Sequence, residues 1–292
     1  MATDGTLFLG VDGGGTGCRV RLVDAAGHVL GEGTAGAANI RLGLNESWGQ
    51  ILAATDQALA AAGLDRNALA RIRTGLGLAG ITGPAEAERV RAAAPGFAGV
   101  VAETDAHTAC LGAFGGRDGA ILILGTGSAG YAIVGGRSHP IGGWGFEISD
   151  DGSGAQLGRE AIRAAVRAYD GLGPASDLTQ AIMARLGGHP PDVVAWVGSA
   201  RPGDYGSLAP LVVEFARQDD PVATALMRAA AAHVATFVRR LLELGAGRVA
   251  LMGGLAPILR DWLDPALTGV LTTAEGDAMD GAVLLARRTI SL

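Results

Sequence analysis

Residues 7–23 read LFLGVDGGGTGCRVRLV. The apolar run 7–12 predicts a buried strand, and the alternation across 18–23 predicts a second strand with one polar face. The glycine-rich segment 13–17 between them predicts a tight turn, because glycine accepts backbone angles that other residues avoid. This stretch therefore predicts a hairpin whose first strand ends at Asp12, beside the turn.

The same pattern returns in the second half of the chain. Residues 120–124 predict a strand, 125–128 a glycine turn and 130–134 a second strand. Each hairpin is followed by a third strand, at 28–31 and at 139–142, and then by alternating helices and strands. Helices are expected at 47–62 (capped by Asn45 or Ser47), 84–94, 107–114, 153–169, 221–244 and 277–287, and strands at 72–80, 99–105, 248–252 and 269–273.

Each half therefore reads βββαβαβα, an internal repeat that predicts two similar α/β lobes. Each lobe is expected to hold a mixed sheet flanked by helices, with a ligand-binding cleft between the lobes. We place the boundary near residues 112–117, which gives an N-terminal lobe at 1–113 and a C-terminal lobe at 114–292. The final helix can pack back on the N-terminal lobe.

The composition excludes several classes of protein. Apolar residues make up 49 % of the chain and charged residues 18 %, which is typical of a folded protein. The net charge of −6 and the lack of a basic tract argue against nucleic acid as a partner. No uninterrupted apolar run has the length of a membrane span, residues 1–10 lack a signal-peptide pattern, and Cys18 and Cys110 form no spaced motif. A cytoplasmic protein is expected.

All 23 basic residues besides histidine are arginine, and the sequence holds no lysine. A Walker A loop and a protein kinase each need a lysine on the phosphates, and pyridoxal enzymes and Schiff-base aldolases need a lysine amine. The sequence therefore excludes these classes.

The two glycine turns suggest phosphate binding. Backbone N–H groups in such a turn can converge on phosphate oxygens, and hydroxyl side chains add donors. The candidate ligands are Gly13, Gly14, Gly15 and Thr16 in the first turn and Thr126, Gly127 and Ser128 in the second. An ordinary glycine hairpin is the alternative for either turn, but two turns at matching positions of a repeat favour the phosphate role.

Two neighbouring features extend this interpretation. Asp12, beside the first turn, is a candidate Mg²⁺ ligand through water, since Mg²⁺ uses few carboxylates and several waters; a turn-capping aspartate is the alternative. Gly253 and Gly254 follow a predicted strand and could lie against an adenosine, or form an ordinary loop. Residues 125–130 also match G-x-G-x-x-G, but a dinucleotide site needs a helix after the glycines, and a strand is predicted there.

These motifs resemble a known superfamily. Asp12-Gly-Gly-Gly-Thr16, Gly125-Thr-Gly-Ser128 and Gly253-Gly254 are similar to the two phosphate motifs and the adenosine motif shared by actin, heat-shock chaperone ATPases and hexokinase. Gly142-Gly-Trp-Gly145, Asp150-Asp-Gly-Ser153 and Thr104-Asp105-Ala106 resemble the N-acetylglucosamine kinase and glucosamine kinase group of the BadF/BadG/BcrA/BcrD ATPase family.

The resemblance implies an actin-like ATPase fold of two ribonuclease-H-like lobes and an ATP-dependent, Mg²⁺-dependent amino-sugar kinase acting on a 6-hydroxyl. It implies that Asp105 is the catalytic base and that the sugar is bound by Asn39, Ala79, Gly80 and Asp150. Trp144 can stack on a sugar or simply pack. His107 is expected to be a packed or solvated histidine.

One departure concerns the sugar. The N-acetylglucosamine kinases carry asparagine where this chain has Ala129. This leaves the choice between glucosamine and N-acetylglucosamine open, with a lean toward free glucosamine.

Two alternatives remain at this point. An ATPase activator of a 2-hydroxyacyl-CoA dehydratase belongs to the same family, but it needs cysteines that hold an iron–sulfur cluster across a dimer, and neither cysteine matches that position. A nucleotide-switched binding module, like a chaperone or actin, would need further domains. The expected partner is a small amino sugar; the oligomeric state stays open, a homodimer included.

Overall fold

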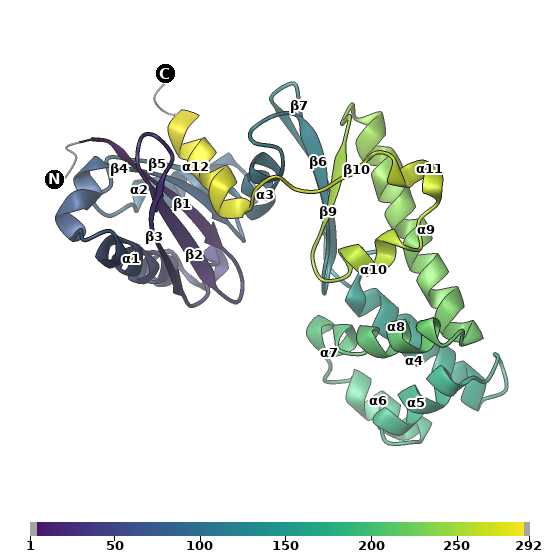
Figure 1. The fold of residues 1–292 in the computed structure, drawn as a ribbon. Helices are drawn as coiled ribbons and strands as arrows, with labels where there is room; N and C mark the ends of the chain where they lie inside the picture. The colour runs from purple at the N-terminus through teal and green to yellow at the C-terminus, as the bar shows by residue number, and fades with distance from the viewer. Residues whose placement is uncertain (1–4, 289–292) are drawn as a thin grey trace. The chain divides into compact units, whose positions relative to one another are not determined.

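The computed structural model describes residues 5–288, which form two compact units. The first unit takes in residues 5–119, 135–138 and 273–288, and the second takes in 120–134 and 139–272. Both units are coloured along the chain in Figure 1. Each unit is described by itself below.

The first unit is a five-stranded mixed sheet with helices on both faces. Its elements are β1 (Leu7–Gly13), β2 (Cys18–Val23), β3 (Val29–Ala35), η1 (Ile40–Leu42), α1 (Leu44–Ala61), η2 (Arg66–Arg71), β4 (Ile72–Leu78), α2 (Pro84–Ala92), β5 (Gly99–Thr104), α3 (Asp105–Ala113) and, from the end of the chain, α12 (Ala278–Arg288). The strand order is β3-β2-β1-β4-β5. β1 pairs antiparallel with β2 and parallel with β4, which in turn pairs parallel with β5.

Small residues let the helices approach the sheet closely. A side chain at Gly31 would collide with the backbone of α1 at Ala58, and one at Gly75 would collide with the backbone of α12 at Ala282. Alternate strand residues such as Leu9 and Leu76 pack with α1 in one apolar core, whereas Phe8 packs with α12 on the other face. The ends of β1, β4 and β5 are thereby held in a rigid layer.

The second unit repeats this sheet and adds helices. Its elements are β6 (Gly119–Leu124), β7 (Ser128–Val134), β8 (Arg137–Gly142), α4 (Gly154–Tyr169), α5 (Asp177–Arg185), α6 (Pro190–Val197), α7 (Pro202–Gly206), α8 (Ala209–Arg217), α9 (Pro221–Glu243), β9 (Val249–Met252), α10 (Ala256–Arg260), α11 (Pro265–Thr268) and β10 (Leu271–Thr272). The strand order is β10-β9-β6-β7-β8. Read in reverse, as β8-β7-β6-β9-β10, it corresponds strand by strand to the first sheet, with β6 in the central place of β1. The predicted pair of five-stranded α/β sheets is confirmed.

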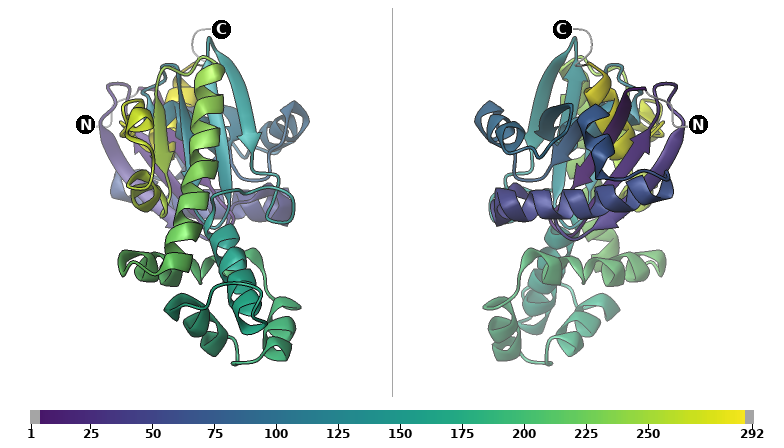
Figure 2. Two further views of the ribbon diagram at one scale, coloured as in Figure 1. Left: turned by 90° about the vertical axis from the view of Figure 1, so that its right-hand side faces the viewer. Right: turned by 90° about the vertical axis from the view of Figure 1, so that its left-hand side faces the viewer.

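Helix α9 lies along the second sheet, as the left view of Figure 2 shows. It is long and apolar enough, by length and composition, to cross a membrane. Nine of its residues are buried, among them Met227, Val234 and Leu241, and they pack in the core of this unit. This is the pattern of an amphipathic core helix.

Several predicted boundaries are wrong by a few residues. Helix α1 begins at Leu44, and its N-cap is Gly43, so the predicted cap at Asn45 or Ser47 is wrong. Gly43 has a φ of 114°, and this non-helical conformation separates η1 from α1. Ser47 instead donates its hydroxyl to the carbonyls of Asn39 and Gly43. The last strand, β10, has two residues instead of the five predicted. Residues 125–130 lead into strand β7 and not into a helix, as predicted. The G-x-G-x-x-G match is therefore not a dinucleotide-binding site.

Candidate active site

The first glycine turn closes the β1–β2 hairpin. Gly14 donates its N–H to the Gly17 carbonyl at 2.8 Å, and the Gly13 carbonyl accepts from the Ala79 N–H at 2.8 Å. A side chain at Gly13 would collide with Leu78, whereas a side chain at Gly15 would meet no atom within 4 Å. Gly15 and Thr16 are exposed, so the tip of the turn is accessible to a ligand.

Asn39, Ala79 and Gly80 lie beside this turn. Ala38 donates its N–H to the Gly14 carbonyl at 3.1 Å, and Ile40 donates to the Ala79 carbonyl at 3.2 Å. Gly80 has a φ of 93°, and a side chain there would collide with Asn39 Oδ1. Since that oxygen already accepts from the Arg41 N–H at 2.9 Å, the Asn39 amide is held in one orientation.

Asp105 follows β5 and is the first residue of α3. Leu78 pairs with both Gly13 and Thr104 in parallel ladders, so β1, β4 and β5 end at the same edge of the sheet. Ligands of α/β sheets commonly bind at the carboxyl ends of parallel strands. The fold therefore brings Asp12, Gly80 and Asp105 to one edge of the first unit.

The Asp105 carboxyl lies in a partly buried position. Burial raises its pKa, and the negative charge of Asp12 adds to the increase. The N–H of Ala106 donates to Oδ1 at 2.8 Å, which opposes part of this shift and fixes the side chain. A raised pKa suits a carboxylate that accepts a proton near neutral pH.

His107, two residues later, is buried in the helix. Burial lowers its pKa to about 4, with the charge of Arg288 adding to the decrease. Its Nδ1 lies 3.2 Å from Ser138 Oγ. The imidazole is therefore neutral and packed, in agreement with the prediction.

The second glycine turn joins β6 to β7 and meets the start of α4. Gly125 donates its N–H to the Gly127 carbonyl at 2.9 Å. The first N–H groups of α4, on Gly154 and Ala155, donate to the carbonyls of Gly125 and Thr126 at 2.8 and 3.1 Å. The turn carbonyls thus accept backbone hydrogen bonds within the protein. The Thr126 side chain is exposed and so is accessible to a ligand.

Asp150 links this turn to the loop that carries Trp144. The backbone N–H groups of Ser128 and Gly145 both donate to its carboxyl, although burial dominates and raises its pKa. Asp150 takes a φ of 65°, which is unusual for a residue other than glycine, and its carboxyl packs against Gly127. The Ser128 hydroxyl donates to the Asp151 carbonyl at 2.7 Å. Trp144 is 70 % exposed and so does not pack in a core.

Gly253 and Gly254 follow β9, next to the second turn. β6 and β9 are parallel, with Ile123 paired to Met252, so the second turn and the glycine pair leave the sheet at the same edge. Gly253 has a φ of 93° and packs against the Leu124 carbonyl, while a side chain at Gly254 would meet no atom within 4 Å. An open glycine there can accept a flat ligand group.

The first turn offers one carboxylate, that of Asp12, to a metal ion. Among residues 5–288, no group of three or more histidine, cysteine or acidic side chains could hold a metal. Both hydrogen bonds from Arg19 to the Asp12 carboxylate end on Oδ2, and the Asp12 side chain is 20 % exposed. One accessible carboxylate fits a Mg²⁺ that takes its other ligands from water and phosphate.

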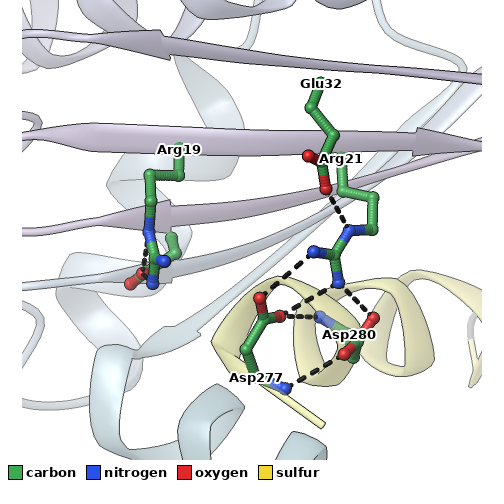
Figure 3. A network of polar contacts seen from close by, with 6 residues as sticks. Arg19, Arg21, Glu32, Asp277 and Asp280 are labelled. Atoms are coloured by element: carbon green, nitrogen blue, oxygen red, sulfur yellow. Dashed lines mark hydrogen bonds and ion pairs between the residues drawn. The ribbon is translucent and has the colours of Figure 1, made fainter. Parts of the chain in front are cut away.

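The partner of Asp12 is Arg19, which sequence reasoning missed. Arg19 donates to Asp12 Oδ2 through Nη2 at 2.5 Å and through Nε at 3.2 Å. The alternation of residues 18–23 was the available signal, since it places Arg19 and Arg21 on one face of the hairpin (Figure 3).

The comparisons with known proteins agree with this geometry. The model of the BadF/BadG/BcrA/BcrD ATPase family matches residues 9–286. The chain belongs to this family. It is 37 % identical to Glucosamine kinase GspK of Vibrio cholerae serotype O1 over 279 residues, which cover 96 % of this chain and 95 % of that protein.

Solved structures show the same fold. A candidate N-acetylglucosamine kinase from Chromobacterium violaceum is 39 % identical, covers 97 % of this chain and 100 % of its own, and has a TM-score of 0.86. A ROK family glucokinase from Streptomyces griseus, solved with glucose and AMPPNP, is 21 % identical with a TM-score of 0.52 over 97 % of this chain and 99 % of its own. The second likeness bears on fold alone; together they confirm the actin-like ATPase fold of sugar kinases.

Proposed function

We propose that this chain transfers the γ-phosphoryl group of ATP to the 6-hydroxyl of an amino sugar, with glucosamine as the favoured substrate. The observation that carries the proposal is the position of Asp105, a partly buried carboxyl with a raised pKa at the same sheet edge as Asp12 and the first glycine turn. The likeness to Glucosamine kinase GspK over nearly the whole chain supports the substrate class.

Asp105 is proposed to accept the proton of the attacking sugar hydroxyl. Phosphoryl transfer depends on positioning the two reactants and on neutralising charge, so a fixed carboxylate beside the hydroxyl suffices as the base. The bond from Ala106 fixes the carboxyl before a substrate arrives. Asn39, Ala79 and Gly80 are proposed to contact sugar hydroxyls from the same edge of this unit.

The nucleotide is proposed to use the glycine turns. In the first unit, Gly13, Gly15 and Thr16 are proposed to bind phosphate oxygens, and in the second unit Thr126 and Gly127. Gly14 and Ser128 belong to the same motifs, but their N–H groups donate to Gly17 and Asp150, so these two residues would hold the turns in shape. Gly253 and Gly254 would contact the adenosine. Asp12 would hold Mg²⁺ through water, and the metal would neutralise the charge on the phosphate oxygens.

Trp144 and Asp150 are proposed as further sugar contacts. The exposed indole of Trp144 offers a flat apolar surface for a sugar ring. Ala129 offers no amide to pair with an acetamido group, which is the reason for proposing a free amine at that point of the sugar. This supports glucosamine over N-acetylglucosamine.

The dehydratase activator is the rival within the same family. Its cluster needs thiolates at an accessible surface, whereas both Cys18 and Cys110 are buried. Burial raises the pKa of the Cys18 thiol to about 12, with Asp12 adding to the increase. Neither thiol is placed to hold a cluster between two copies, which favours the kinase.

A coupled assay of ADP release tests the proposal. The purified chain is supplied with ATP, Mg²⁺ and, in turn, glucosamine, N-acetylglucosamine, glucose, mannosamine and muramic acid. We expect sugar-dependent ADP release that is greatest with glucosamine, and a product that NMR identifies as the 6-phosphate. Absence of ADP release with every hexosamine would refute the kinase proposal, and iron in the purified protein would favour the rival.

A further inference from the structure

The second unit holds a pocket that the proposed reaction does not use, and we call it the α9 pocket. It lies between helix α9, the end of β8 and the loop after β8, and its volume is about 270 Å³. Ligand pockets typically measure about 300–1,000 Å³, so a ligand near the lower end of that range fits. The lining residues, all in the second unit, are Ile141, Gly142, Ser149, Asp151, His233, Thr236, Phe237 and Arg240.

Helix α9 contributes one stripe of side chains to the α9 pocket. The stripe consists of His233, Thr236, Phe237 and Arg240, whose spacing of i, i+3, i+4 and i+7 places them on one face of the helix. Arg240 donates to Glu243 through Nη1 at 3.0 Å, and its side chain is 55 % exposed. An exposed pair of this kind contributes little to stability, so the guanidinium can turn to an anionic ligand at small cost. A guanidinium binds a phosphate through two N–H groups at once.

The loop after β8 contributes the opposite charge. Gln156 Nε2 donates to Asp151 Oδ1 at 2.9 Å, and Oδ2 of the same carboxylate is positioned to accept from an ammonium group. Ser149 adds a hydroxyl, which can both donate and accept. The Phe237 ring lies against Gly142, where a side chain would collide with it. The α9 pocket therefore combines a cation, an anion, hydroxyl groups and an aromatic ring.

An amino-sugar phosphate carries the groups that match this lining. Its phosphate matches Arg240, its amine matches Asp151, and its hydroxyls match Ser149 and Thr236. The apolar face of its ring matches Phe237. A sugar that lacks the amine or the phosphate would pair with one of the two charged side chains only. The product of the proposed reaction has both groups.

We propose that the α9 pocket binds the amino-sugar 6-phosphate formed by the proposed reaction, and that the bound product inhibits the kinase from this second site. The inference rests on the proposed function and adds a regulatory site to it. The pocket and the proposed sugar contacts share one loop, since the loop after β8 carries Trp144 and Asp150 as well as Ser149 and Asp151.

That shared loop is the means of inhibition. Trp144 lies between Gly143 and Gly145, whose φ values of 73° and 104° are conformations that glycine adopts without strain, so the loop has more than one accessible path. A product molecule that joins Asp151 to Arg240 holds the loop in the conformation described here, in which Trp144 is 70 % exposed. Because a ligand favours the conformation to which it binds, the product opposes movement of Trp144 onto a sugar.

Initial-rate kinetics and calorimetry of the full chain test this inference. Glucosamine 6-phosphate is added to the ADP-release assay at fixed ATP, Mg²⁺ and glucosamine, and is also titrated calorimetrically without turnover. Loss of a charged hydrogen bond typically weakens binding by about 10- to 100-fold, so Arg240→Gln should raise both the half-inhibiting concentration and the Kd by that factor. Arg240→Lys should recover part of the loss. Without added product, kcat and KM of both variants should equal those of wild type.

Comparison compounds test the chemistry of the α9 pocket. Glucose 6-phosphate lacks the amine, and inorganic phosphate lacks the whole sugar, so each should inhibit wild type at least about tenfold more weakly than glucosamine 6-phosphate does. The matched control is Arg239→Gln, because Arg239 is an exposed residue of α9 outside the lining of the pocket. This variant should bind glucosamine 6-phosphate and be inhibited by it as wild type is.

Equal inhibition and equal product affinity in wild type and Arg240→Gln would overturn the inference, because the product would then act at the active site alone. In that case, sugar-dependent ADP release by wild type would still support the proposed function. A wild type that releases no ADP with any hexosamine, but binds glucosamine 6-phosphate in a manner that depends on Arg240, would overturn the proposed function and support the binding site.

Discussion

Replacing Asp105 by asparagine removes the proposed base and leaves the local structure in place. The amide oxygen can still accept the Ala106 N–H, now 2.8 Å from Oδ1, and the side chain keeps its size. Loss of a general base typically slows a reaction about 10²- to 10⁴-fold, which corresponds to about 2.7–5.4 kcal/mol of transition-state stabilisation. We expect kcat to fall by this factor while the affinity for ATP changes little.

The raised pKa of Asp105 also predicts how stability depends on pH. Because burial favours the protonated carboxyl in the folded state, its contribution to stability is present below the unfolded pKa, ordinarily about 3.9, and is lost as the pH rises through the raised folded pKa. Asparagine carries no charge at any of these pH values. The variant should therefore gain stability relative to wild type between pH 4 and pH 7.

Two measurements check these expectations together. Steady-state kinetics with the preferred sugar give kcat, and urea unfolding at pH 4 and pH 7 gives the free energy of unfolding. His107→Gln is the matched control on the same helix, since the neutral, buried His107 should contribute little to the chemistry. Near-normal kcat in Asp105→Asn, together with a large loss in His107→Gln, would show that the base has been misassigned.

Three further changes address the metal, the sugar and the nucleotide. Asp12→Asn should raise the Mg²⁺ concentration needed for half-maximal activity, measured by a Mg²⁺ titration at fixed ATP; an unchanged midpoint would contradict the metal role. Ala129→Asn should shift kcat/KM toward N-acetylglucosamine relative to glucosamine by supplying an amide donor, and equal loss on both sugars would contradict the specificity argument. Gly253→Ala should weaken ADP binding and lower the Tm, because Gly253 has a φ of 93° and packs on the Leu124 carbonyl; calorimetry and thermal unfolding measure both effects.

The local sequence was sufficient to predict the strands and the repeat. The apolar run that became β1, the alternation of β2 and the glycine segments between strands are local signals, because side-chain periodicity and turn conformation depend on neighbouring residues. They predicted both five-stranded sheets and the strand after Gly125–Ser128. The start of α1 was missed because an unusual glycine conformation at Gly43 ended one helix and began the next.

Only the tertiary structure decided which side chains meet. Asp12 and Asp105 are more than ninety positions apart in the chain, and they come to one edge because β1, β4 and β5 are parallel neighbours in register. The charge that Asp12 adds to the surroundings of Asp105 follows from that pairing. Two partners of Arg21, Asp277 and Asp280, likewise depend on the return of the chain's end, where α12 covers the first sheet. Sequence periodicity assigns a residue to a face, but packing between distant segments determines the groups that it touches there.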